Sequence, residues 1–317
     1  MTTNRLPTDP RIAAKLRSRR RLRVLLAFTV VSLGLYVFIR LDRSAAERLG
    51  PVAEVIYNLF NGTPGDSPPL TPAARRFAAD IRAMGGHPSV RVTSRGYFGI
   101  IGQAESLHAS FDGPKFDDAA LARLATQYGD RIDSLAIEYT GVTDAGLSNL
   151  SKFTSLSHLA IRNEPGRPGA PVGPGRITDA ALVHLEGLAR LSSLHLGGLP
   201  VTDDGLYSIA GLQGLITLQV VDAKARGDFL AGLSSLPRLA ILYLDGCDVN
   251  EEKLAALSNA TSLSLLSLRG VPLSGDALRH LKAIPRLRTL NIAECGFPGE
   301  SLAALKQSKP GLKIEMQ

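Results

Sequence analysis

Leu242-Tyr-Leu, Leu266-Ser-Leu and Leu290-Asn-Ile are three forms of one motif, placed 24 residues apart along the chain. Leu218-Gln-Val precedes them at the same interval. Each form is reached through a similar lead-in, such as Leu239-Ala-Ile-Leu242, and is followed by a polar residue and then Leu-x-x-Leu. A fixed period of about 20–29 residues headed by Leu-x-x-Leu-x-Leu predicts stacked units of one strand and one helix. The stretch from Leu215 to Leu290 therefore decides the fold.

The same motif continues in both directions from this stretch. The expected strand heads are Leu107, Leu135, Leu159, Leu194, Leu218, Leu242, Leu266 and Leu290, with a last half-unit at Leu312-Lys-Ile314. Their spacings are 28, 24 and 35 residues and then 24 residues throughout. The long interval contains a Pro- and Gly-rich insert, residues 162–176. Such an insert maps to a loop on one face of the stack. It is either part of the binding side or a tolerated flexible bulge, and its composition favours the bulge.

The second half of each repeat predicts a helix. Val142-Thr-Asp-Ala-Gly-Leu147 and its equivalents place a Thr, Asp, Asn or Ser where the side chain can cap a free backbone N–H. An acidic residue follows, and the positive end of the helix favours it there. Arg226 and Pro298 occupy the capping column in two repeats, so we expect frayed or shorter helices at these positions. The Leu-x-x-Leu of each repeat predicts an apolar stripe that packs inward against the strands.

On these motifs, residues 107–314 resemble a leucine-rich repeat protein of the ribonuclease-inhibitor-like, cysteine-containing class, in the Val-Thr-Asp-Ala-Gly-Leu variant common in bacteria. The resemblance implies an α/β solenoid with a curved parallel sheet inside and helices outside. It also implies recognition of a protein or peptide through the concave face of the sheet. It transfers no catalytic residue, and the chain contains no Gly-x-Ser-x-Gly or His-Glu-x-x-His motif. We therefore expect no enzyme activity and no cofactor.

The net charge of +7 is confined to one end of the chain. Residues 1–43 contain ten Lys or Arg and two acidic residues, which gives +8. The 26 basic and 27 acidic residues that remain give −1. A solenoid that binds nucleic acid would carry its basic residues on the repeats, so we exclude that partner.

The N-terminal part predicts a membrane anchor. Residues 24–39 contain no charge, and residues 24–41 are expected to form a transmembrane signal anchor with Arg23 and Arg40 at its ends. The alternatives are a signal peptide cleaved near Ser44 and a buried soluble helix. The basic tail, residues 1–23, favours a cytoplasmic N-terminus, a single-pass protein in the cell membrane and a solenoid on the outer (periplasmic) side. Residues 42–71 are expected to combine a juxtamembrane amphipathic segment with a Pro/Gly linker.

Residues 72–106 predict an N-terminal cap ahead of the repeats, residues 107–317. Thr71 and Pro72 give a helix start, and Gly85-Gly86 gives its end. Residues 90–92 and 97–101 are expected to be short strands around a turn at residues 94–96. A cap is needed because the first repeat would otherwise expose the core of the stack.

Two cysteines and two histidines are the residues with potential for metal or redox chemistry. Cys247 and Cys295 occupy the same column two repeats apart, and strands about 4.8 Å apart separate them by about 10 Å. This is too far for a disulfide, so buried thiols are expected and metal or redox use is the minor alternative. His158 and His195 are expected on adjacent strands. They could bind a partner, be ordinary exposed histidines or bind zinc. No Cys or carboxylate stands beside them at ligand spacing, so we expect no metal site.

The outward positions of the strands form the candidate binding surface. Mixed charge with Tyr and Arg is typical of surfaces that bind proteins. The candidate protein-binding residues on this concave face are Glu138, Tyr139, His158, Arg162, His195, Gln219, Tyr243, Asp245, Arg269 and Asn291, with Thr217, Ser267 and Thr289 beside them. The sequence thus favours a membrane-anchored interaction module for an unknown protein or peptide. The alternative is a structural cell-envelope protein that contacts wall polymer or self-associates.

Overall fold

The computed structural model of the chain describes residues 70–94, 103–163, 177–297 and 299–316. Several expected segments lie outside the described residues: the basic tail, the expected anchor 24–41, nearly all of segment 42–71, the expected strand 97–101 and most of the insert. Within the described residues, no helix is both long enough and apolar enough to cross a membrane. The cap and the repeats form one compact unit.

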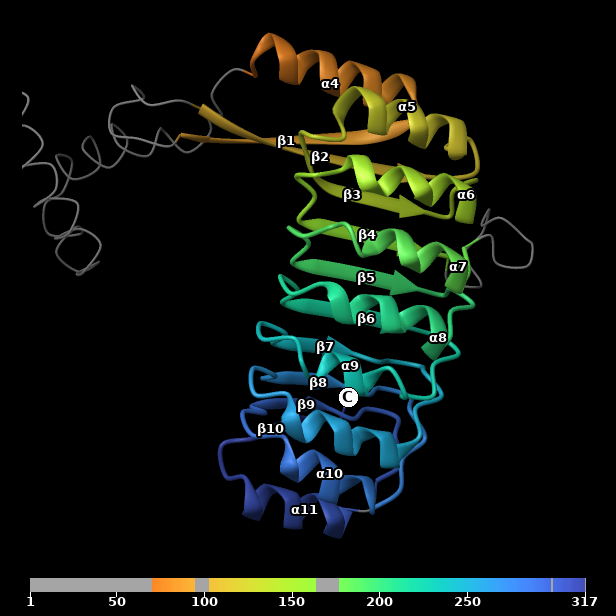
Figure 1. Cartoon of the computed structure of the whole chain (residues 1–317). Helices are drawn as coiled ribbons and strands as arrows, with labels where there is room; N and C mark the ends of the chain where they lie inside the picture. Colours follow the sequence, from red (N-terminus) through yellow and green to blue (C-terminus); the bar gives the residue numbers. More distant parts are fainter. Residues whose placement is uncertain (1–69, 95–102, 164–176, 298, 317) are drawn as a thin grey trace, which may run out of the picture. The chain divides into compact units, whose positions relative to one another are not determined.

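Ten strands lie side by side in chain order and form one sheet (Figure 1). The strands are β1 (Gly86–Ser94), β2 (Gln103–Asp112), β3 (Ile132–Glu138), β4 (His158–Arg162), β5 (Ser193–Gly197), β6 (Thr217–Val221), β7 (Ile241–Tyr243), β8 (Leu265–Ser267), β9 (Thr289–Asn291) and β10 (Lys313–Glu315). Each strand from β2 to β10 is parallel to its neighbour. This is the parallel sheet of a leucine-rich repeat solenoid.

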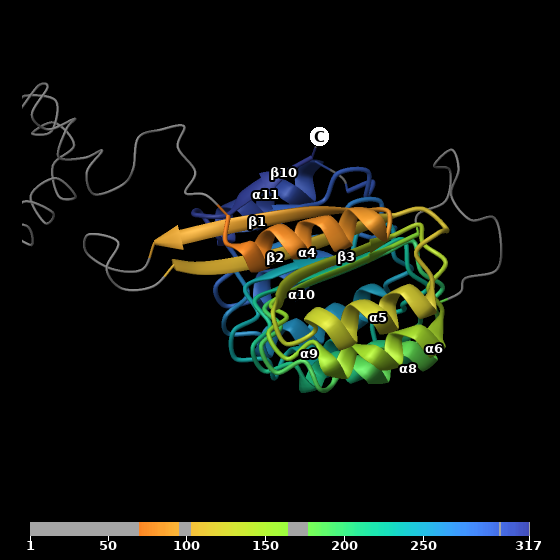
Figure 2. The ribbon, with the colours of Figure 1, turned by 90° about the horizontal axis from the view of Figure 1, so that it is seen from above.

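A helix follows nearly every strand, and the helices of the repeats stack along one side of the sheet (Figure 2). The α-helices are α4 (Pro72–Ala83), α5 (Asp118–Tyr128), α6 (Asp144–Leu147), α7 (Asp179–Leu182), α8 (Asp203–Leu206), α9 (Leu230–Leu233), α10 (Ala277–Ala283) and α11 (Gly299–Ser308). The 3-10 helices are η2 (Ser148–Lys152), η3 (Val183–Leu185), η4 (Tyr207–Gly211) and η5 (Glu251–Asn259). In the central repeats, one α-helical turn thus runs directly into a 3-10 helix.

The core lies between the sheet and these helices, as the repeat pattern predicts. Leu242 and Leu244 are fully buried, whereas Tyr243 between them is partly exposed. The outer leucines Leu254 and Leu257 are also fully buried. Because side chains alternate between the two faces of a strand, this burial leaves the opposite side of the sheet open. We call that side the open sheet face; it corresponds to the concave face expected from the sequence.

The predicted cap helix is confirmed, and it closes the end of the core. The side chain of Thr71 accepts a hydrogen bond from the N–H of Ala74 at 3.1 Å, and Pro72 begins α4. Phe77 is fully buried and packs edge-on against the ring of Tyr128, with 5.1 Å between the ring centroids. Strand β1 is longer than the expected 90–92, and its neighbour in the sheet is β2 itself. The cap therefore continues the sheet of the repeats.

The register at the two ends differs from the expected one. Leu135 pairs with Ala109, so Ala109 and not Leu107 is the strand head of the first repeat. Leu107 and Ala109 lie two residues apart in β2, so both point into the core, and the register shift between Leu107 and His108 places Ala109 opposite Leu135. The spacing of the leucines was therefore misleading. At the other end, Leu290 pairs with Ile314, not with Leu312. The last strand thus keeps the interval of 24 residues.

The expectation of weakened helices is confirmed in part. The helix after Arg226 begins only at Leu230, without a side-chain cap. The helix after Pro298, α11, extends over 10 residues, so the expectation of a short helix there was wrong. Proline is compatible with the start of a helix because its missing N–H would have no partner there.

A ladder of acidic side chains links consecutive repeats, and the sequence reading did not foresee it. Asp179 accepts hydrogen bonds from both the N–H and the hydroxyl of Thr202 in the next repeat, at 2.7 Å each. The same two-bond contact joins Asp118 to Thr143, Asp144 to Thr178 and Glu251 to Ser274. The acidic residue therefore caps the following repeat, in addition to lying at the start of its own helix. We call these contacts the acidic ladder.

Candidate functional site

The open sheet face consists of three rows of side chains that run across the strands. Pairing puts Thr217, Ile241, Leu265 and Thr289 in one row and Gln219, Tyr243, Ser267 and Asn291 in the next. A third row follows the strand ends, with Glu138 paired to Arg162. The structure therefore brings most of the predicted residues onto one face.

The centre of this face is apolar. Ile241 and Leu265 are direct neighbours across β7 and β8, and Tyr243 lies two residues along β7. All three are partly exposed. We call Ile241, Tyr243 and Leu265 the central cluster. Large apolar side chains that stay accessible on a folded surface often mark a binding site.

The sequence analysis included Tyr243 in the site but missed Ile241 and Leu265. Both residues were read as part of the leucine lead-in to the next strand head. A signal was available, because a residue directly before a buried strand leucine points to the opposite face. Ser267 was expected among the outward positions of the concave face, but it is completely buried and cannot contact a partner.

The charged residues near the cluster are already engaged within the protein. Asp245 accepts hydrogen bonds from the hydroxyl of Ser267 at 2.6 Å and from the N–H of Arg269 at 3.0 Å. Arg269 forms an ion pair with Glu294 at 2.7 Å, and both side chains are more than half exposed. Asp245 thus contributes to the structure of the site, whereas Arg269 and Glu294 remain accessible at its rim.

Charge and amide contacts recur elsewhere on the face. Arg162 and Glu138 approach each other to 3.7 Å on neighbouring strands. Asn291 accepts a hydrogen bond from the N–H of Ala293 at 3.1 Å, so its side chain shapes the backbone at the end of β9. Gln219 is partly exposed beside Tyr243.

Tyr139 does not belong to the open sheet face, so that assignment was wrong. Its side chain is buried, and its φ of 54° places it in the left-handed region. Strand β3 ends at Glu138, and the chain turns at the next residue. Gly198, Gly246 and Gly270 have the same conformation after their own strands. The alternation of side chains therefore ends one residue before Tyr139.

The two predicted histidines lie on the open face but in different rows. His158 pairs with Ser193, and His195 pairs with Ala160. His158 also shares its row with His108, from which Ser134 separates it, and burial lowers the pKa of His108. Within the described residues, no group of three or more His, Cys, Asp or Glu side chains could hold a metal ion.

Solved structures include proteins that are similar to this chain. An internalin from Listeria monocytogenes is similar to this chain, with a TM-score of 0.46 and 19% sequence identity. The likeness covers 66% of this chain and 60% of the internalin chain, so this chain spans less than two thirds of it. No family model matches the chain, and no curated protein matches it either.

Cys247 and Cys295 are free and buried. Each thiol donates a hydrogen bond to a backbone carbonyl of the preceding repeat. The sulfur of Cys247 lies 3.4 Å from the carbonyl oxygen of Val220, and that of Cys295 lies 2.9 Å from that of Leu268. Burial raises the pKa of the Cys247 thiol to about 12 and also raises the pKa of Cys295. Both thiols therefore stay protonated at neutral pH.

We expect neither thiol to react with a thiolate-specific reagent at pH 8 while the protein is folded. The thiolate is the reactive form, and burial both suppresses it and blocks access. The measurement is titration with a chromogenic disulfide reagent, first in buffer and then in guanidinium chloride. Two thiols should appear after unfolding and essentially none before it. Rapid reaction of either thiol in buffer would contradict its structural role.

Proposed function

We propose that the chain is a non-catalytic interaction module that binds a protein or peptide on its open sheet face. The observation that carries this proposal is the central cluster of Ile241, Tyr243 and Leu265. Tyrosine is enriched among the residues that dominate binding energy, and such residues lie near the centre of an interface. Here the aromatic ring has aliphatic neighbours and a rim of polar and charged side chains, as protein interfaces commonly have.

The contacts of the rim indicate what the partner must supply. Arg269 and Glu294 neutralise each other, so the rim offers polar contacts without a strong field of one sign. The partner should therefore bring an apolar side chain for the cluster, surrounded by groups that form hydrogen bonds. Thr217 and Gln219 on one side and Thr289 and Asn291 on the other are placed to bond with it.

The test is capture of partners by the full chain from the cells that produce it. Tyr243→Ala should lower the amount captured about 30-fold, since truncating a central residue costs about 2 kcal/mol or more. Met316→Ala is the control, because Met316 is an exposed large apolar residue near the C-terminus, outside the central cluster. Equal capture by wild type and Tyr243→Ala would refute the assignment of the open sheet face.

The alternative, a structural protein that contacts wall polymer, makes a different prediction in the same assay. A polymer bound through scattered polar contacts should be retained both by Tyr243→Ala and by Met316→Ala. Retention of isolated wall material by the full chain, unchanged by Tyr243→Ala, would favour this alternative.

We also propose that residues 24–41 anchor the chain in the cell membrane, with the N-terminus in the cytoplasm and the repeats outside. The support is the uncharged stretch preceded by a strongly basic tail. We expect the full chain to stay in the membrane fraction after a high-salt wash. We also expect protease to digest the repeats once the outer layers of the cell are opened. A repeat region that stays protected in spheroplasts would place it on the cytoplasmic side and overturn the proposal.

A further inference from the structure

The helical side of the stack carries an exposed apolar feature that the open sheet face does not explain. Val183 and Tyr207 are 50% and 47% exposed, whereas the cores of their repeats are almost completely buried. Among the described residues, Met316 near the C-terminus is the third large apolar side chain with such exposure. Two of the three thus lie on the outer helices.

Val183 and Tyr207 occupy the same position in consecutive repeats. Each directly follows the buried leucine that begins the Leu-x-x-Leu, and helices α7 and α8 pack against each other. Ala231 and Ala255 continue this column, and both are exposed. We call Val183, Tyr207, Ala231 and Ala255 the outer stripe. It ends at Ser148 on one side and at Arg279 on the other.

Beside the stripe lies a second column of exposed residues. It consists of the residues four positions later in each repeat, namely Gly187, Gly211, Ser235 and Asn259, all exposed or partly exposed. A methyl group added at Gly187 or Gly211 would meet nothing within 4 Å. The surface next to Tyr207 is therefore open enough to receive a ring.

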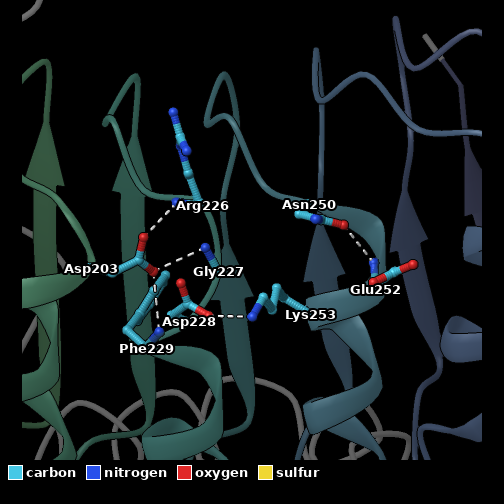
Figure 3. Close-up of polar contacts among 8 residues, drawn as sticks. All are labelled: Asp203, Arg226, Gly227, Asp228, Phe229, Asn250, Glu252 and Lys253. Atoms are coloured by element: carbon cyan, nitrogen blue, oxygen red, sulfur yellow. Dashed lines mark hydrogen bonds and ion pairs between the residues drawn. The ribbon is translucent and has the colours of Figure 1, made fainter.

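Charges of opposite sign flank the stripe along its two edges. Three residues before the stripe positions, Asp204, Asp228 and Glu252 are exposed, and Asp276 continues this row in the repeat beyond the stripe. Seven residues after the stripe positions, Arg190 and Arg238 are exposed, and Arg286 continues this row in the repeat beyond the stripe. Two charges have the opposite sign to the row that they lie near. Lys253 forms an ion pair with Asp228 of the acidic row at 2.5 Å (Figure 3), and Glu186 lies on the side of the basic row. They weaken the charge pattern without reversing it.

We propose that the outer stripe binds the outer stripe of a second copy of this chain, with both stacks of repeats running in the same direction. In this arrangement a two-fold axis runs along the stack, between the column of Tyr207 and that of Gly211. The rotation lays the acidic edge of each copy against the basic edge of the other. It also places Tyr207 of each copy over Gly211 of its partner.

The charge pattern selects this direction over the opposite one. A two-fold axis along the strands would also bring the two stripes together, with the stacks antiparallel. It would then place acidic edge on acidic edge and basic edge on basic edge, and like charges brought together across an interface are unfavourable. The parallel arrangement also suits two chains anchored in one membrane at their N-termini, as proposed above, and it leaves both open sheet faces free.

The size of the face indicates a weak dimer. Ten residues, which form a short helical segment and the turn after it, separate the acidic row from the basic row and span about 15 Å at the rise of an α-helix. Four helices about 10 Å apart extend the face to about 35 Å, so each copy would bury roughly 500 Å². Stable complexes bury about 800 Å² per partner, so we expect association that depends on high local concentration.

Cross-linking in cells that produce two differently tagged full chains tests the proposal. One chain carries Ala231→Cys and the other carries Ser235→Cys, and both keep the buried Cys247 and Cys295. The parallel dimer brings these positions together, so an oxidant should join the two tags in one disulfide-linked product. A second pair, Val183→Cys with Ala255→Cys, meets only in the antiparallel dimer and should give no product, since a disulfide needs Cα atoms within about 7 Å.

A variant of the stripe separates specific association from random collision. Tyr207→Lys in both chains should lower the yield of the first pair at least about five-fold, because it buries a charge where the ring packed. Met316→Lys, a matched change at the other large exposed apolar residue, should leave the yield unchanged. The proposal is overturned if the first pair gives no product, if the second pair gives more than the first, or if Tyr207→Lys leaves the yield as it was.

Discussion

Asp203→Ala should destabilise the folded chain by about 3 kcal/mol, because Asp203 takes the place of an acidic-ladder residue between its repeat and the next. In the repeat after Asp203, Arg226 occupies the capping position at which other repeats have Thr. The carboxylate of Asp203 accepts three backbone hydrogen bonds from this segment (Figure 3). The donors are the N–H groups of Arg226 at 2.7 Å, Gly227 at 2.9 Å and Phe229 at 3.1 Å. Because α9 has no side-chain cap of its own, these bonds hold the segment that leads into it.

The measurement is urea unfolding followed by circular dichroism, with two comparison variants. Asp204→Ala changes the adjacent, exposed carboxylate and should shift stability by less than about 0.5 kcal/mol. Asp203→Asn keeps one acceptor oxygen and should fall between Asp203→Ala and wild type. If Asp203→Ala unfolds at the same urea concentration as Asp204→Ala, the three hydrogen bonds contribute nothing measurable.

The acidic ladder shows why part of the structure could not be predicted from the sequence. The Thr-Asp pair reads locally as a helix start, and the capping prediction is confirmed at Thr178 and Thr202. The second role of the aspartate depends on a residue about 24 positions away, which only the stacking of repeats brings close. Gly205 reveals the same dependence, since a Cβ there would lie 2.4 Å from a carboxylate oxygen of Asp179.

In the candidate site, too, the local sequence pattern predicted some residues correctly, whereas others depend on how the repeats stack. Alternation along the strands correctly placed Tyr243 and Arg269 on the open sheet face, because that rule needs no knowledge of neighbours. It failed at Tyr139, where the backbone leaves the strand, and at Ser267, which is buried although its position points outward. The register at Leu107 was equally hidden, because Leu107 and Ala109 both point into the core and only the pairing with Leu135 shows which of them heads the repeat.

Leu265→Ala and Leu266→Ala should have opposite consequences, although they are the same substitution at adjacent positions. Leu266 is fully buried and lies in register with Leu242 and Leu290 in the centre of the core. Its truncation leaves a cavity and should cost about 3 kcal/mol of folding free energy. Leu265 is partly exposed in the central cluster, so its truncation should cost less than about 1 kcal/mol.

Partner capture should be affected more by Leu265→Ala than by Leu266→Ala, the reverse of their effects on stability. At a temperature where both are folded, Leu265→Ala removes part of the surface that faces the partner and should weaken capture. Leu266→Ala keeps that surface and should capture as wild type does. Equal losses of stability would mean that Leu265 packs into the core. Normal capture by Leu265→Ala would mean that the binding surface does not include β7 and β8. The comparison is sharp because adjacent residues of a strand point to opposite faces of the sheet.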